Sequence, residues 1–160
     1  MHRLVSLAVF LLLVVIASIV GGQFIGDDWY HLVMKQPSWN PSATAMASVW
    51  AVLYVLMAVS AWMIWDTRRG LARVALAWWG LQLLLSICWS WMFLGLHRIG
   101  WALAVMTLWL MVVLIVIKMF RSIKLEASSL MMPVAGWLLF AWVLNFVQWH
   151  LNGGGIGSIL

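Results

Sequence analysis

The chain has 160 residues, of which 66% are hydrophobic and only 8% are charged, and its formal net charge is +5. A soluble domain carries about 25% charged residues, so this composition excludes a globular fold covered by water. The nine Lys and Arg residues are scattered over short connections without forming a basic stripe, which argues against nucleic acid as a partner. The single cysteine, Cys88, excludes an internal disulfide, and no cysteine spacing typical of a metal site is present.

Five apolar segments are long enough to cross a bilayer as helices, which takes about 20 residues each. The segments are apolar on all sides, whereas the strands of a membrane barrel alternate apolar and polar residues. The expected spans are residues 4–22, 43–65, 74–96, 100–117 and 130–151. The sequence therefore predicts an all-α integral membrane five-transmembrane-helix bundle, with residues 1–160 as a single membrane domain.

The first span has an alternative interpretation, because Arg3 followed by an apolar run is also typical of a secretory signal peptide. The apolar run is long for such a signal, and Gly21-Gly22-Gln23 is a poor context for cleavage. We therefore favour a retained transmembrane helix.

The connection between the first two spans, residues 23–42, is the longest and contains several aromatic and Pro residues. A long connection of this kind is a candidate lid over a binding site. An interfacial loop anchored by Trp residues is the alternative, and the residues alone leave the two open.

The charges of the connections predict the orientation in the membrane, because positive residues collect on the cytoplasmic side. Seven Lys and Arg residues belong to one side and two, Lys35 and Arg98, to the other. We therefore expect the N-terminus in the cytoplasm and the C-terminus outside. Asp66, at the end of the second span, is expected to pair with Arg68 or Arg69.

Three spans carry a mixed aromatic and polar stripe at helical spacing, and polar side chains in a span should face the bundle interior. The stripes are Trp50, Tyr54 and Met57 in the second span; Gln82, Ser86, Trp89, Ser90 and Phe93 in the third; and Trp137, Ala141, Asn145 and Gln148 or Trp149 in the fifth. Hydrogen bonds between helices, at about 0.6 to 2 kcal/mol each, are the alternative to a pocket. That alternative is favoured for Gln82 and stays open for Asn145, whereas Trp50 and Tyr54 favour an apolar pocket for a planar ligand.

Catalytic and metal-binding constellations are absent from the spans. No two carboxylates lie within them, and no row of buried charges suggests an ion path. All four histidines (His2, His31, His97 and His150) fall at span ends or in connections, which argues against a permanent haem ligated across the bundle. His150 could touch the polar edge of a ligand, although a simple interfacial role is favoured for it.

The order of several motifs resembles that of a known family. These motifs are Lys35-Gln36-Pro37-Ser38-Trp39-Asn40-Pro41 in the long connection, Val49-Trp50 and Leu53-Tyr54 in the second span, Trp89-Ser90-x-x-Phe93 in the third, and Pro133-x-x-x-Trp137-x-x-Phe140-Ala141-x-x-Leu144-Asn145 in the fifth. Together they resemble the TspO/MBR family of tryptophan-rich sensory proteins, which includes the mitochondrial translocator protein, from Trp29 to Asn152.

The resemblance implies a five-helix bundle, expected to form a homodimer, with a pocket closed by the first connection. It implies tetrapyrrole ligands, protoporphyrin IX or haem, with no obligatory cofactor and with membrane lipid around the helices. Sterols and benzodiazepine-type ligands are further partners that it suggests. The ligand-binding residues it implies are Trp39, Trp50, Tyr54, Ser86, Trp89, Phe93, Trp137, Ala141, Leu144 and Asn145.

Some bacterial members of the family are reported to degrade bound porphyrin in light, which makes Trp50 and Trp137 candidate photochemical residues. The chain departs from the family pattern at Ser42, where a second Pro is usual, at Ser86, where Asn is usual, and at Val134, where Tyr is common. The sterol motif lacks its Tyr and its basic residue within positions 145–150.

The sequence therefore favours porphyrin binding with a sensory, transport or porphyrin-homeostasis role, in a bacterial cell membrane. Light-dependent porphyrin degradation, sterol binding, and a structural membrane role without a small ligand are the alternatives.

Overall fold

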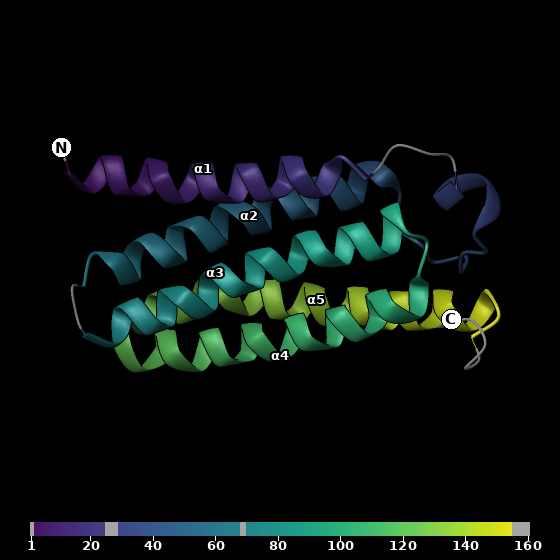
Figure 1. Cartoon of the computed structure of the whole chain (residues 1–160). Helices are drawn as coiled ribbons and strands as arrows, with labels where there is room; N and C mark the ends of the chain where they lie inside the picture. The colour runs from purple at the N-terminus through teal and green to yellow at the C-terminus, as the bar shows by residue number, and fades with distance from the viewer. Residues whose placement is uncertain (1, 25–28, 68–69, 155–160) are drawn as a thin grey trace.

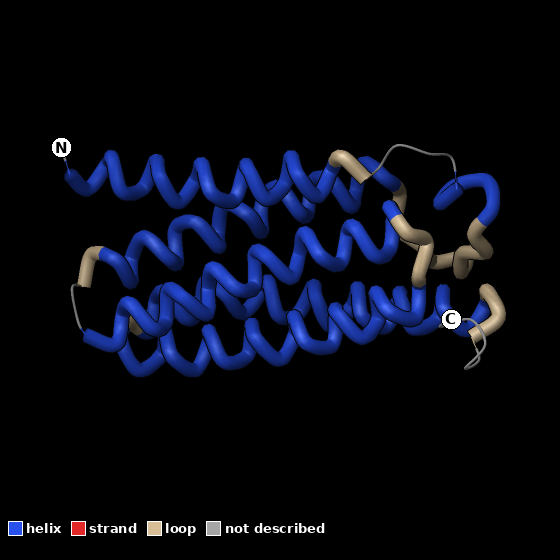
Figure 2. The backbone as a smooth tube through the Cα atoms, in the orientation of Figure 1, coloured by secondary structure: helices blue, strands red, loops and turns tan. Residues whose placement is uncertain are grey.

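The computed structural model describes residues 2–24, 29–67 and 70–154, and these form a bundle of five long helices (Figure 1). The helices are α1 (His2–Gly22), α2 (Ala43–Trp65), α3 (Gly70–Ser90), α4 (Ile99–Ile123) and α5 (Leu125–Leu151), with two short π-helical turns, η1 (Trp29–Val33) and η2 (Trp91–Gly95). All regular structure in the described residues is helical (Figure 2). Each long helix is apolar and long enough to cross a membrane, which confirms the predicted all-α membrane bundle.

Three helices extend well beyond the predicted spans at the end that carries the N-terminus, and α1 begins slightly early, at His2. Helix α3 begins at Gly70 instead of residue 74, α4 continues to Ile123 instead of 117, and α5 begins at Leu125 instead of 130. A span predicted from hydropathy ends at a charged residue such as Lys118. The helix itself can continue through such residues, because long basic side chains reach from the bundle to water. At its other end the third span passes from the α-helix into η2, where the Leu96 amide donates to the Trp91 carbonyl at 2.8 Å.

The five helices form a ring in which α1 lies beside α2, then come α5, α4 and α3, and α3 returns to α1. Consecutive helices are antiparallel, so the two ends of the bundle differ (Figure 1). One end, called the N-terminal end, carries the N-terminus and the α2–α3 and α4–α5 connections. The opposite end, called the loop end, carries η1, η2 and the end of α5.

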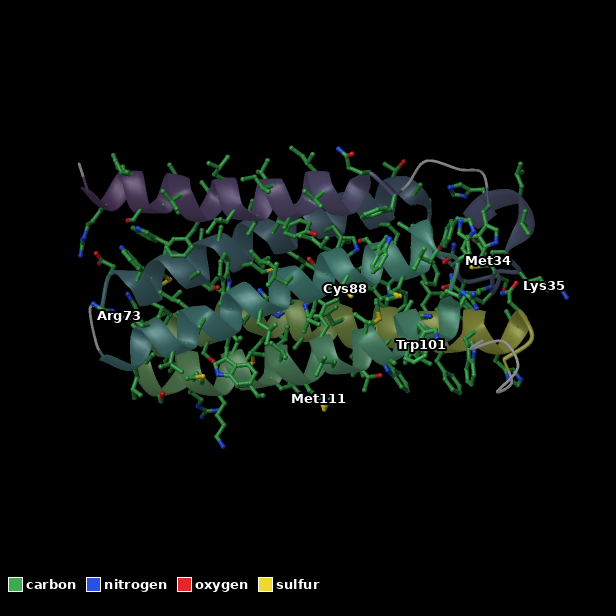
Figure 3. All side chains as sticks on the ribbon, in the orientation of Figure 1. Met34, Lys35, Arg73, Cys88, Trp101 and Met111 are labelled. Atoms are coloured by element: carbon green, nitrogen blue, oxygen red, sulfur yellow. The ribbon has the colours of Figure 1, made fainter. Side chains whose placement is uncertain are left out.

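The outer surface of the bundle is apolar over most of its length, as a hydrocarbon environment requires. Figure 3 shows Met111 pointing outward from the middle of α4, while Arg73 and Lys35 lie at opposite ends of the bundle. Helix α1 is the most peripheral: 22% of its most apolar stretch is buried, against 33% to 39% in the other four helices.

Asp66 binds Arg3 of α1 across 63 residues of sequence. The Arg3 Nε and Nη2 atoms donate to the two Asp66 carboxylate oxygens at 3.0 Å and 2.6 Å, and the Trp62 indole donates to the Arg3 carbonyl at 3.0 Å. These contacts hold the start of α1 against the end of α2. The partners expected for Asp66, Arg68 and Arg69, lie outside the described residues.

Candidate functional site

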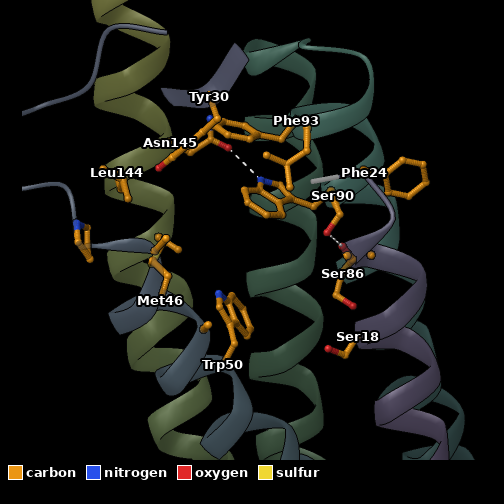
Figure 4. Close-up of a pocket in the computed structure, with 18 of the residues that line it drawn as sticks. Ser18, Phe24, Tyr30, Met46, Trp50, Ser86, Ser90, Phe93, Leu144 and Asn145 are labelled. Atoms are coloured by element: carbon orange, nitrogen blue, oxygen red, sulfur yellow. Dashed lines mark hydrogen bonds between the residues drawn. The ribbon is translucent and has the colours of Figure 1, made fainter. Parts of the chain in front are cut away.

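A cavity of about 410 Å³ lies in the half of the bundle nearest the loop end, lined by residues of all five helices and of part of the first connection (Figure 4). Its volume falls within the range of about 300–1,000 Å³ that is usual for small-molecule sites. The lining residues are Ser18, Gly21, Gly22, Phe24, Tyr30, His31, Pro41, Ala43, Met46, Ala47, Trp50, Ala51, Tyr54, Ser86, Trp89, Ser90, Phe93, Leu94, Trp109, Ala141, Leu144, Asn145 and Gln148.

Eight of the ten residues predicted to form the pocket line this cavity. They are Trp50, Tyr54, Ser86, Trp89, Phe93, Ala141, Leu144 and Asn145. The other two, Trp39 and Trp137, do not line it; both pack against Phe140, with ring centroids 5.9 Å and 5.0 Å away. Helical spacing places Trp137 on the same face as Ala141, but spacing cannot say how far along the helix a cavity extends.

Two stacked aromatic pairs form most of the flat surface that faces the cavity. Trp50 of α2 stacks on Trp109 of α4 with centroids 5.6 Å apart and planes inclined by 13°. Trp89 of α3 stacks on Phe93 of η2 at 5.0 Å and 17°. Because each pair joins neighbouring turns or facing helices, the rings are held in place before any ligand arrives.

Asn145 fixes the orientation of Trp89 through bonds to two other helices. Its Oδ1 accepts from the Trp89 indole at 3.0 Å, shown as a dashed line in Figure 4, and its Nδ2 donates to the Ile99 carbonyl at 3.3 Å. Asn145 therefore lines the cavity and also links α5 with α3 and α4. Gln82, for which an interhelical bond was favoured, is fully buried, but neither polar atom of its amide has a partner among the described residues.

The described part of the first connection covers the loop end of the cavity and is bound to α5. The Lys35 amide donates to Asn152 Oδ1 at 2.9 Å, and Asn152 Nδ2 donates back to the Lys35 carbonyl at 2.9 Å. Gln148 Nε2 donates to the Tyr30 hydroxyl at 3.3 Å. Trp29 stacks on His97 with centroids 4.2 Å apart. The connection therefore packs on the bundle as a cover, rather than lying apart from it.

The cavity is open along the α1 and α2 side. Among its lining residues, Ser18 and Gly22 of α1 and Ala43, Ala47 and Ala51 of α2 are exposed. The three alanines are spaced four residues apart and share one face of the helix. Larger side chains at these positions would narrow the opening of the cavity. The three alanines belong to a membrane-spanning helix.

The lining favours stacking and hydrogen bonding over acid–base chemistry. Among the described lining residues there is no Lys, Arg, Asp or Glu, and the one imidazole, His31, is exposed at the rim. No group of three or more His, Cys, Asp or Glu residues that could hold a metal ion occurs in the described part of the chain. His150 is exposed and is not among the lining residues.

Sequence reasoning missed several contributions to the cavity, of which Trp109 and Gly21 are the most informative. Trp109 was not recognised because its neighbours in the fourth span are aliphatic; its place in the middle of a span, away from the interfaces where Trp is usual, was the available signal. Gly21 lets α1 approach α3, since a Cβ atom at this position would lie 3.1 Å from Ser90 Oγ. The Gly21-Gly22 pair at the end of an apolar span was the corresponding signal.

Comparison with known proteins places the chain among membrane proteins of one family. A model of the TspO/MBR family matches residues 8–150. The protein CrtK of Rhodobacter capsulatus is 32% identical over 149 residues, which cover 92% of each chain. The translocator protein of Bos taurus is 31% identical over 149 residues, which cover 89% of this chain and 88% of its own. A tryptophan-rich sensory protein of Cereibacter sphaeroides is 33% identical over 127 residues, covering 79% and 78%. With five membrane-spanning helices and a match over most of its length, this chain belongs to the TspO/MBR family of integral membrane proteins.

Proposed function

We propose that this protein binds a tetrapyrrole, protoporphyrin IX ahead of haem, in the cavity between its helices, and that binding serves a sensory, transport or porphyrin-homeostasis role. The observation that carries the proposal is the pair of stacked aromatic surfaces, Trp50–Trp109 and Trp89–Phe93, on a cavity within the membrane-spanning helices. A flat conjugated ring gains from offset stacking on such surfaces in addition to burying apolar area. The sensory and translocator names of its relatives support a role of this kind.

The charges of the lining determine how a porphyrin would enter. Its two propionates would be costly to bury without a cation, and the described lining residues offer none. The apolar edge of the macrocycle therefore goes between Trp50 and Trp89, while the propionates point to the rim at the loop end, where His31 is exposed. The open side also lets a macrocycle extend beyond the cavity. Because the site relies on stacking, it does not require iron, and this favours protoporphyrin over haem.

A binding experiment in lipid nanodiscs tests this proposal. Porphyrin is titrated into discs with and without protein, and the shift of its Soret band is measured, so that partition into lipid is subtracted. Trp50→Ala and Trp89→Ala should each lower the affinity at least about tenfold, equal to about 1.4 kcal/mol. The matched control is Trp91→Ala, because Trp91 is exposed and does not line the cavity although it lies two residues from Trp89. Unchanged affinity in both cavity variants would rule out this site.

Light-dependent porphyrin breakdown is a second candidate, and the geometry favours Trp50 over Trp137 as its residue. Trp50 lines the cavity and stacks on Trp109, whereas Trp137 packs behind Phe140, outside the lining. Illumination of the complex in air should bleach the Soret band, and Trp50→Phe should slow the bleaching more than Trp137→Phe does. A Soret band that is stable under illumination would show that the protein binds porphyrin without degrading it.

A further inference from the structure

One wall of the cavity carries hydroxyl groups within an otherwise apolar and aromatic lining. It consists of Tyr54 of α2 and Ser86 and Ser90 of α3, called here the hydroxyl wall. Figure 4 shows Ser86 and Ser90 one above the other on α3, on the side of the cavity opposite Leu144 and Met46. Ser86 is 3% exposed, so its hydroxyl lies in a site from which bulk water is largely excluded.

The hydrogen of each serine hydroxyl is already donated to the backbone. Ser86 Oγ donates to the Leu83 carbonyl at 2.7 Å, and Ser90 Oγ donates to the Ser86 carbonyl at 3.1 Å. A hydroxyl has one hydrogen and two lone pairs. Both serines can therefore offer a ligand only acceptor lone pairs.

The Tyr54 hydroxyl lines the same wall of the cavity. The neighbouring polar atom on α3, the Trp89 indole nitrogen, donates to Asn145. The two serines of the hydroxyl wall are thus hydrogen-bond acceptors toward the cavity.

We propose that the hydroxyl wall makes the cavity select ligands that carry a hydrogen-bond donor, an O–H or N–H group, on the edge that enters first. This inference rests on the proposed function and narrows its ligand class: a tetrapyrrole with a hydroxyl group on the entering edge should bind more tightly than one whose entering edge carries only hydrocarbon groups, which is held by stacking alone. A donor on that edge finds lone pairs at Ser86 and Ser90, whereas an apolar edge leaves them unpaired. An ionised carboxylate beside Ser86 and Ser90 would meet only other acceptors. The selection is therefore for neutral donors and against buried anions.

Two porphyrins that differ only in donors test the proposal: haematoporphyrin, with two 1-hydroxyethyl groups, and mesoporphyrin, with ethyl groups in the same places. Each is titrated in nanodiscs, and its affinity is referred to protein-free discs. The wild type should prefer haematoporphyrin by about threefold to tenfold, the range expected for one or two neutral hydrogen bonds. In the double variant Ser86→Ala/Ser90→Ala the ratio should fall to about one, because the acceptor oxygens that distinguish the two porphyrins are gone.

The matched control is Ser129→Ala, because Ser129 also donates to a carbonyl four residues back, Leu125, but lies on the exposed face of α5. Its ratio of haematoporphyrin affinity to mesoporphyrin affinity should equal that of the wild type. Ser86→Cys provides a second variant that keeps the side-chain shape, and the ratio should fall because sulfur is a weak acceptor. Equal ratios in the wild type and in both serine variants would overturn the selection while leaving porphyrin binding intact. Loss of binding by both porphyrins in the wild type would instead overturn the proposed function, and this inference with it.

Discussion

The two halves of the bundle are built from the same five helices but differ in how closely their side chains pack. Toward the N-terminal end, side chains such as Ala61, Ile64 and Met131 interdigitate with no exposed surface, and the rings of Phe10 and Trp65 meet edge to face. Toward the loop end, the helices carry large flat rings, and a cavity of about 410 Å³ remains. Rings that stack face to face cannot also fill the corners between helices, so space is left beside the stacked pairs.

This difference shows which half provides stability and which provides function. In a membrane, helix association depends on close packing and hydrogen bonds, because lipid is as apolar as the side chains. The N-terminal half supplies that packing. The loop-end half replaces part of it with hydrogen bonds that hold rings in fixed orientations, as Asn145 does for Trp89. The packed N-terminal half therefore supports one end of the cavity, and hydrogen bonds such as the one from Trp89 to Asn145 hold its walls.

The largest expected effect comes from removing a packed side chain. Leu138 is fully buried away from the cavity, and Leu138→Ala should lower the free energy of unfolding by about 2–3 kcal/mol, near the lower end of the range for large-to-small core changes. Leu144→Ala, at the cavity, should cost less, because it enlarges a space that already exists. Thermal unfolding in one detergent measures both. Equal losses would show that the two halves are packed alike.

A smaller difference in the free energy of unfolding is expected between substitutions of two buried amide side chains, Asn145 and Gln82. Asn145→Leu leaves the Trp89 indole and the Ile99 carbonyl without their partner and should cost about 1–3 kcal/mol. Gln82→Leu should be neutral or stabilising, because it removes an amide with no partner in the described structure. The measurement is again thermal unfolding, with porphyrin affinity as a second readout that should fall only for Asn145→Leu. A loss at Gln82 as large as at Asn145 would contradict this distinction.

The part of the first connection that covers the cavity should be able to open locally while the helices stay folded. Asn152→Ala removes two bonds to the Lys35 backbone, and we expect a local loss of about 1 kcal/mol. Hydrogen exchange should accelerate at residues 29–36, whereas amides in the middle of α4 should keep their protection. Exchange that accelerates equally in both regions would mean that the cover and the bundle open together.

The smallest effect is expected at the N-terminal end. The Arg3–Asp66 pair has two good hydrogen bonds, but its side chains are 76% and 33% exposed. Exposed pairs contribute about 0–1 kcal/mol and weaken as salt rises. Arg3→Gln should therefore lower the unfolding temperature slightly at low salt and not at high salt. A large effect independent of salt would show that this contact, and not packing alone, holds α1 to the bundle.

Much of the fold was predictable because the membrane imposes one rule on every span. Five apolar segments gave five helices, and helical spacing placed Trp50, Tyr54, Ser86, Trp89 and Asn145 on inward faces. The resemblance to the family added Leu144 to the residues that line the cavity. The bounds of α3, α4 and α5 at the N-terminal end were not predictable from hydropathy, because their backbones continue as helix past the charged residues that interrupt the apolar runs.

The remaining features depend on how helices are placed beside one another, and a sequence does not state this directly. The pairing of Arg3 with Asp66 joins residues far apart in the chain, and the bond from Asn145 to Ile99 uses a backbone carbonyl that could belong to any residue. Trp109 enters the cavity only because α4 packs opposite α2 at Trp50. The depth of the cavity, which excludes Trp137, follows from the same placement.

The near-parallel arrangement of Trp50 and Trp109, 5.6 Å apart and inclined by 13°, also has an optical consequence. Two indoles so close should share their electronic excitation and give a coupled pair of bands in circular dichroism. A guest that slides against Trp50 would disturb this coupling. The molecule therefore contains a built-in spectroscopic sensor of occupancy that needs no label.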